Sequence, residues 1–61
     1  MPVVTIQMAE GRSLEQKRRV VQDITRSLAE TFQIDPGMVT VLIQELKREN
    51  IAKSGILLSE S

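Results

Sequence analysis

The first apolar pattern in the chain is an alternation over residues 3–8. Val4, Ile6 and Met8 fall on one side of an extended backbone, and the residues between them fall on the other. A period of two is typical of a β-strand with one buried face. Residues 9–12 break the alternation, so the pattern predicts a strand over residues 3–8.

The apolar period then changes to that of a helix. Ser13 and Gln16 match a capping box, in which each side chain satisfies a backbone N–H group at the start of a helix. One stripe then recurs at spacings of three and four: Lys17, Val20, Val21, Ile24, Leu28 and Phe32. This stripe predicts an amphipathic helix of about 19 residues that begins at Leu14.

The second half of the chain returns to extended structure. Pro36 cannot continue the helix and Gly37 tolerates unusual backbone angles, so residues 33–37 are predicted to form a turn. Residues 39–46 are β-branched and apolar, which predicts a second strand with both faces covered. In the tail, Ser54 and Gly55 are suited to the turn of a short hairpin.

A strand, a helix and a second strand in this order predict a right-handed βαβ unit with parallel strands. The expected fold class is α+β, with one domain over residues 1–61 and a C-terminal hairpin or tail. One helix covers only one face of a two-stranded sheet, and such a sheet is marginal alone. We therefore expect the other face, and the apolar tail residues 56–58, to contact further copies of the chain.

The composition leads to the same expectation. The chain has 61 residues, 41% of them apolar, with no cysteine and no histidine. Disulfides are excluded, a structural zinc site is not expected, and no cofactor is implied. A chain of about 60 residues buries only roughly 60% of its unfolded surface, so it usually needs another source of stability. The expected source is a homo-oligomer.

The charge balance bears on the class of partner. Eight basic and eight acidic side chains give a net charge of zero, whereas nucleic-acid-binding proteins normally carry a basic excess. No apolar run approaches the length of a membrane span, and no signal peptide is visible. We expect a cytoplasmic protein that binds neither nucleic acid nor membrane.

Pro2 is the first candidate for chemistry. If the initiator Met1 is removed, Pro2 becomes an amino-terminal secondary amine at the start of a strand. Apolar surroundings would disfavour its charged form and lower its pKa toward neutrality, where a general base works best. The alternative is that Pro2 simply suits the first position of a strand.

Arg12 is the second candidate. It precedes the predicted N-cap, and an arginine beside free helix N–H groups forms a site for a carboxylate or phosphate. The alternative is a solvated surface arginine. Glu10 and Glu15 are interpreted as surface carboxylates, and the basic run over residues 17–19 is interpreted as a solvated face because helical spacing spreads it around the axis.

Pro2 at a strand start, the segment over residues 10–13 that reads Glu-Gly-Arg-Ser, and the Glu-Gln-Lys that begins at residue 15 are together similar to the 4-oxalocrotonate tautomerase family. The resemblance covers nearly the whole chain. It implies a βαβ subunit that forms dimers with a four-stranded sheet, usually assembled as a trimer of dimers. It also implies that Pro2 is the general base of a keto–enol isomerase and that Arg12 binds the carboxylate of a small substrate.

Two positions depart from the family pattern. A second arginine of the family corresponds to Thr40, which can donate a hydrogen bond but cannot neutralise an enolate. An aromatic residue that makes the proline pocket apolar corresponds to Ile51, which can still exclude water. Arg48 and Lys53 are both candidates to replace the missing cation.

The resulting hypothesis is a tautomerase of small unsaturated 2-hydroxy or 2-oxo acids, with Pro2 as catalytic base and Arg12 and Ile51 as substrate-binding residues. Three alternatives stay open at this point. They are a non-catalytic oligomeric module with the same fold, a related dehalogenase or hydratase, and a DNA-binding dimer, which fits poorly with the zero net charge.

Overall fold

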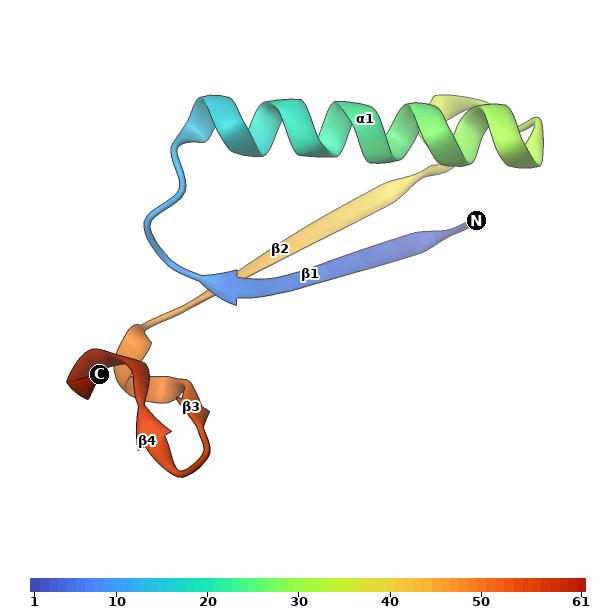
Figure 1. Cartoon of the computed structure of the whole chain (residues 1–61). Helices are drawn as coiled ribbons and strands as arrows, with labels where there is room; N and C mark the ends of the chain where they lie inside the picture. Colours follow the sequence, from blue (N-terminus) through green and yellow to red (C-terminus); the bar gives the residue numbers. More distant parts are fainter.

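The computed structural model describes the whole chain, residues 1–61, as a two-stranded sheet under one long helix, followed by a small tail. The elements of the main layer are β1 (Val3–Ala9), α1 (Leu14–Phe32) and β2 (Thr40–Leu46). Figure 1 shows α1 lying across one face of β1 and β2, with the tail extending from the end of β2 away from the helix. No helix has the combined length and apolar character that a membrane crossing requires. The predicted α+β class and βαβ order are confirmed.

Helix α1 begins and ends for identifiable reasons. The Ser13 hydroxyl accepts from the Gln16 N–H at 3.1 Å, and the Gln16 side chain accepts from the Ser13 N–H at 3.0 Å, so the predicted capping box is present. At the other end Gln33 takes a left-handed conformation with φ of 55°, and its N–H donates to the carbonyl of Ala29. The helix therefore ends at Phe32, directly before the predicted turn over residues 33–37, and its predicted length of about 19 residues is confirmed.

The turn between α1 and β2 differs from the prediction in one respect. Residues Pro36–Met38 form a short 3-10 helix, whose first turn is capped by the Asp35 side chain accepting from the Gly37 N–H at 3.0 Å. Gly37 has no positive φ, so the unusual backbone angle expected at the glycine occurs at Gln33 instead. The Val39 N–H closes the 3-10 helix by donating to Pro36, which delays the start of β2 to Thr40.

Strands β1 and β2 pair in parallel, from Val3 opposite Thr40 to Ala9 opposite Leu46. The face toward α1 carries half-buried apolar side chains such as Ile6 and Ile43. On the other face Val3 and Leu42 are 57% and 50% exposed. The second strand was predicted to be covered on both faces, and in the single chain it is covered on one.

The tail forms the predicted hairpin. Strands β3 (Ala52–Lys53) and β4 (Ile56–Leu57) pair antiparallel across a two-residue turn at Ser54 and Gly55. Both turn residues have positive φ, 54° and 79°, which is the geometry of the tight hairpin turns that match strand twist. The tail also has two 3-10 helices, Arg48–Asn50 and Leu58–Glu60.

The single chain has almost no core. Ala29, which the predicted apolar stripe omitted, is the one buried residue, and Phe32, which the stripe included, is 56% exposed. The chain measures 44 × 22 × 13 Å, with a radius of gyration of 14.7 Å. A compact domain of this length would have a radius of gyration of about 10.5 Å. The fold is therefore open, and apart from Ala29 its apolar side chains are half-buried or exposed.

Candidate active site

Pro2 and Thr40 lie together at one end of the sheet. The Thr40 N–H donates to the Pro2 carbonyl at 3.1 Å, and Thr40 is paired with Val3, the residue after Pro2. The Thr40 side chain lies on the face that α1 leaves open, because Val41 and Ile43 take the helix-facing positions. Position 40 is therefore beside Pro2 of the same chain.

Whether the Pro2 nitrogen can act as a base depends on whether Met1 is present. With Met1 attached, this nitrogen is part of a peptide bond and has no lone pair available for a proton. Met1 is 82% exposed, so nothing in the chain shields it from an aminopeptidase. Removal of Met1 would turn the Pro2 nitrogen into a secondary amine without disturbing the hydrogen bond between Pro2 and Thr40.

Arg12 lies at the opposite end of the sheet. It follows the last residue of β1, whereas Pro2 precedes the first, and a strand of seven residues spans roughly 23 Å at 3.3 Å per residue. The Arg12 guanidinium therefore cannot reach the Pro2 nitrogen of its own chain. The structure separates the two principal candidates and places them at the two ends of β1.

The loop that carries Arg12 has a defined geometry. The Glu10 N–H donates to the carbonyl of Leu46 at 2.9 Å, which extends the strand pairing by one residue. Gly11 then takes a φ of 122°, a conformation that a side chain would strain, and turns the chain toward the N-cap at Ser13. Arg12 is thus held between a strand end and a helix start.

Two hollows meet at Arg12. One, of about 280 Å³, lies between β1 and the first turns of α1 and is lined by Ile6, Met8, Arg12, Gln16, Lys17 and Val20. The other, of about 240 Å³, lies below it at the end of the sheet and is lined by Met8, Ala9, Glu10, Gly11, Arg12 and Arg48. A cationic side chain between two hollows, both with apolar walls from Met8, is suited to the carboxylate of a small apolar acid.

The remaining sequence candidates belong to the tail. Ile51 is half-buried where the chain leaves the 3-10 helix, donating to Arg48 at 3.3 Å and accepting from Leu58 at 2.8 Å. It lies beyond the end of β2, at the Arg12 end of the molecule and far from Pro2 of the same chain. Lys53 pairs with Ile56 in the hairpin and lines neither hollow, whereas Arg48 lines the second one.

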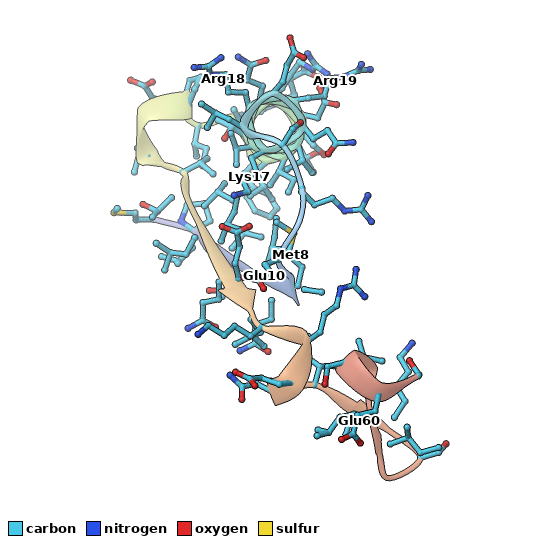
Figure 2. The ribbon with its side chains drawn as sticks, turned by 90° about the vertical axis from the view of Figure 1, so that its left-hand side faces the viewer. Met8, Glu10, Lys17, Arg18, Arg19 and Glu60 are labelled. Carbon is cyan, nitrogen blue, oxygen red and sulfur yellow. The ribbon has the colours of Figure 1, made fainter.

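The basic run after the cap is dispersed around the helix, as predicted. Lys17 forms an ion pair with Glu45 of β2 at 2.7 Å, while Arg19 lies 3.5 Å from Asp23 on the helix surface. Figure 2 shows Arg18 and Arg19 on the side of α1 away from the sheet and Lys17 on the side toward it. These side chains support the helix and do not form a single cationic patch.

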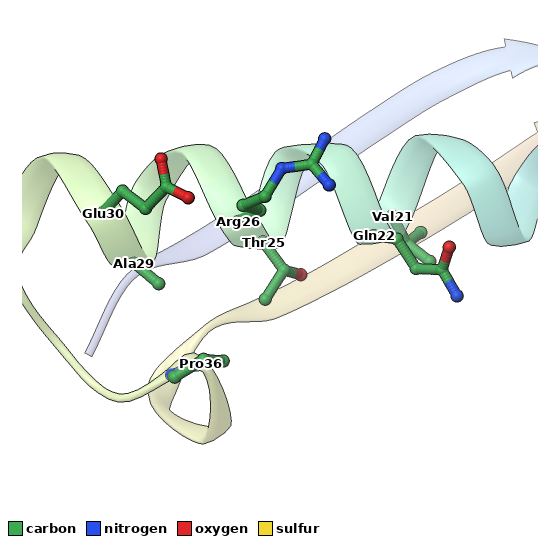
Figure 3. A pocket seen from close by; sticks show the side chains of 7 residues that line it. All are labelled: Val21, Gln22, Thr25, Arg26, Ala29, Glu30 and Pro36. Carbon is green, nitrogen blue, oxygen red and sulfur yellow. The ribbon is translucent and has the colours of Figure 1, made fainter.

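A third hollow lies away from all the candidates. It measures about 420 Å³ and is formed where Thr25 and Ala29 extend from α1 toward Pro36, as Figure 3 shows. It is lined by none of the candidate site residues. No group of three or more carboxylates in the chain gathers where it could hold a metal ion.

One chain therefore holds the candidate site residues in two separate parts. The first part is Pro2 with Thr40, and the second is Arg12 with its hollows and the neighbouring tail. The sequence reasoning did not foresee that Arg48 joins Arg12. The signal was available, because parallel strands end at the same edge of a sheet and both arginines follow such an end.

Comparison with known proteins identifies similar sequences over the same residues. The sequence model of a family described as tautomerase enzyme matches residues 2–60. A 2-hydroxymuconate tautomerase of Bacillus subtilis is 38% identical over 60 residues, covering 98% of this chain and 97% of that protein.

Two solved structures have closely similar folds. A 4-oxalocrotonate tautomerase homologue superposes with a TM-score of 0.96 at 30% identity, covering 100% of this chain and 97% of the other. A heterohexameric 4-oxalocrotonate tautomerase from Chloroflexus aurantiacus superposes with a TM-score of 0.89 at 32% identity, covering 98% and 97% of the two chains.

Proposed function

Because this chain belongs to the tautomerase family and is a tautomerase, we propose that it interconverts the keto and enol forms of small unsaturated 2-hydroxy and 2-oxo acids with Pro2 as its general base. The observation that carries the proposal is the position of Pro2, which starts the region matched by the family and immediately precedes β1. The substrate class is supported by the similarity to a 2-hydroxymuconate tautomerase over 98% of the chain.

In the proposed reaction, Pro2 removes a proton from the substrate and returns it to a different atom of the same substrate. The neutral Pro2 amine, formed once Met1 is removed, takes the proton from the enol hydroxyl and leaves an enolate. The Pro2 ammonium then delivers that proton to a carbon of the same substrate, which gives the keto acid and restores the amine. In the reverse direction Pro2 takes the proton from carbon.

The distance between Pro2 and Arg12 determines how the site is built. Since the two residues lie at opposite ends of β1, we propose that Pro2 and Thr40 of one copy meet Arg12 of another. Ile51 lies at the Arg12 end, so the apolar wall around Pro2 would come from another copy as well. Arg12 would anchor the carboxylate, while Ile51 excludes water and lowers the pKa of the Pro2 ammonium.

A shared site requires a homo-oligomer, and the surface of the chain supports one. The accessible surface is 4908 Å², whereas a compact protein of this mass exposes about 4,000 Å². The C. aurantiacus structure is a heterohexamer. We propose that the protein is a homo-oligomer, either a dimer or a trimer of dimers. The cytoplasmic location expected from the sequence stays a prediction, to be checked by cell fractionation.

Thr40 lowers the expected turnover of this site. A neutral hydroxyl beside Pro2 stabilises a developing enolate less than a guanidinium does, and removing one such electrostatic group typically costs about 10²- to 10³-fold in kcat. We therefore expect a slow tautomerase, with catalysis supplied by Pro2 and binding supplied by the Arg12 end.

The experiment compares wild type with Pro2→Ala on phenylenolpyruvate and 2-hydroxymuconate, after intact mass has established that Met1 is absent from both proteins. Pro2→Ala keeps an amino terminus but changes its basicity and geometry, so kcat/KM is expected to fall at least tenfold. The wild-type pH profile of kcat/KM is expected to rise through neutrality as Pro2 loses its proton. Pro36→Ala, which removes a proline whose nitrogen is always part of a peptide bond, is the control and is expected to retain full activity. Equal activity of Pro2→Ala and wild type on both substrates would assign Pro2 a structural role.

A further inference from the structure

We propose that Arg48 is a second substrate-binding cation that acts with Arg12 on one carboxylate of the substrate. This inference rests on the proposed function, in which Arg12 anchors that carboxylate. It assigns the replacement of the missing family cation to Arg48 rather than to Lys53.

The first argument is placement. Arg12 and Arg48 come from different parts of the chain and are the two cations among the six residues that line the hollow of about 240 Å³ at the end of the sheet. The parallel pairing brings them together, because Ala9 lies opposite Leu46 and each arginine follows its strand within three residues. The hydrogen bond from the Glu10 N–H to the Leu46 carbonyl at 2.9 Å holds the chain segments that follow β1 and β2 side by side.

The second argument is charge. The ion pairs of the chain are Lys17 with Glu45, and Arg19 and Arg26 with Asp23. Neither Arg12 nor Arg48 is among them, and Glu10, the one acid that lines the hollow, pairs with neither. Two guanidinium groups that share a hollow repel each other, and a bound carboxylate removes that repulsion. Each can present a planar fork of N–H donors to the same carboxylate.

The third argument is rigidity. Arg48 begins a 3-10 helix that is closed by hydrogen bonds from Asn50 to Lys47 at 2.8 Å and from Ile51 to Arg48 at 3.3 Å. Arg12 is fixed by the turn at Gly11 and the cap at Ser13. Because both backbones are held, binding an anion orders only side chains, which keeps the entropic cost low.

Lys53 and position 40 do not offer this arrangement. Lys53 lies on β3, pairs with Ile56 and lines none of the hollows. Thr40 starts β2 whereas Arg48 follows its end, so the two are separated by roughly the 23 Å length of the strand. Within one chain Arg48 therefore lies away from position 40, and in the shared site it acts from the copy that supplies Arg12. The positive charge of this site is concentrated at the Arg12 end.

The consequence is a requirement on the substrate. The two arginines select a free carboxylate. An ester of the same acid has no negative charge and loses the charge-assisted contacts with both Arg12 and Arg48. Substrates with a single carboxylate are sufficient for this arrangement, because both cations act on one group.

The test uses Arg48→Ala, Arg48→Lys and Lys53→Ala in the assembled protein, with muconate as a dicarboxylate that has no enol to react. Loss of a charge-assisted contact is expected to weaken muconate binding by calorimetry about tenfold or more in Arg48→Ala. Arg48→Lys is expected to recover part of the loss, and Lys53→Ala, which removes an equal charge, is expected to bind as wild type does.

Kinetics on phenylenolpyruvate provide the second readout. Arg48→Ala is expected to raise KM about tenfold with kcat changed less than threefold, and to leave KM for the methyl ester unchanged. The double variant with Arg12→Ala is expected to lose less than the product of the two single losses, because both side chains bind one group.

The outcomes separate this inference from the proposed function. If Arg48→Ala binds muconate as wild type does while Arg12→Ala does not, the inference is wrong and Pro2 catalysis stands. If Pro2→Ala is fully active but Arg48→Ala loses muconate binding, the proposed base is wrong and the paired cations stand. If Arg48→Ala and Lys53→Ala lose equal affinity for muconate, the loss follows from the change in net charge alone and the inference is wrong.

Discussion

Position 40 shows how one side chain can change the chemistry of a site without changing its geometry. The backbone of Thr40 binds the Pro2 carbonyl at 3.1 Å whatever side chain it carries, so the start of β2 stays in register with Pro2. The side chain points to the open face of the sheet beside the proposed base. A substitution here therefore alters the charge near Pro2 and leaves the pairing intact.

Thr40→Arg is expected to raise kcat on 2-hydroxymuconate more than on phenylenolpyruvate. With one carboxylate held by the Arg12 end, the added guanidinium gives a partner to the second anionic group, which only the dicarboxylate has. Steady-state kinetics on the two substrates measure the difference, with size-exclusion chromatography to establish that the oligomer is intact. Unchanged kinetics on both substrates would mean that position 40 does not line the assembled pocket.

At the scale of residues, the sequence predicted well where a local interaction decides the structure. The capping box of Ser13 and Gln16 and the hairpin turn at Ser54 and Gly55 are of this kind. It failed at Gln33, which takes the left-handed conformation at the helix end although Gly37 has the better intrinsic preference. The end of α1 is set by where the chain must turn toward β2, and no local preference encodes that requirement.

At the scale of elements, α1 is the piece that joins the two parts of the site. It begins beside Arg12 and ends near the start of β2, so its length matches the strands it crosses. The helix is attached to the sheet by the ion pair of Lys17 with Glu45 and by the apolar side chains on the side of α1 that faces the sheet. A change in the start of α1 is therefore expected to act on the Arg12 loop as well as on stability.

Ser13→Ala removes one half of the capping box and is expected to destabilise the assembled protein by about 1 kcal/mol per chain, the usual effect of losing an N-cap. Chemical denaturation at a fixed protein concentration measures the change. Ser27→Ala, at an exposed position within α1, is the matched control and is expected to be neutral or slightly stabilising because alanine favours helix. Equal effects of the two substitutions would show that the cap contributes nothing.

The arrangement of the elements shows which parts of the site could not be predicted from the sequence. Periodicity was enough to order the strands and helix, and the parallel arrangement follows from the connection. The pairing register, Val3 with Thr40 through Ala9 with Leu46, was not available from periodicity. Without the register, the sequence could not predict that Arg48 lines a hollow with Arg12 or that Arg48 lies far from Thr40 of the same chain.

At the scale of the whole molecule, the open shape is the dominant property. One residue of 61 is buried, and the outer sheet face exposes Val3 and Leu42. A chain with so little core does not offset the conformational entropy lost on folding. Folding and association are therefore expected to occur together.

No stable folded monomer is expected at micromolar concentration. Thermal unfolding followed by circular dichroism is expected to show a midpoint that rises with protein concentration, since dissociation accompanies unfolding. Light scattering on the same samples measures the mass. A well-folded species of 6.9 kDa would contradict this expectation.

Complementation between two defective chains tests the central claim most directly, namely that one site takes Pro2 and Arg12 from different copies. Pro2→Ala and Arg12→Ala are unfolded, mixed in equal amounts and reassembled, and each variant alone is carried through the same steps. Random assembly gives about one quarter of sites an intact proline and an intact arginine, so the mixture is expected to recover about one quarter of wild-type kcat/KM while each variant alone stays low. If the mixture is no more active than the variants alone, although it reassembles to the same mass, the two residues do not share a site between copies.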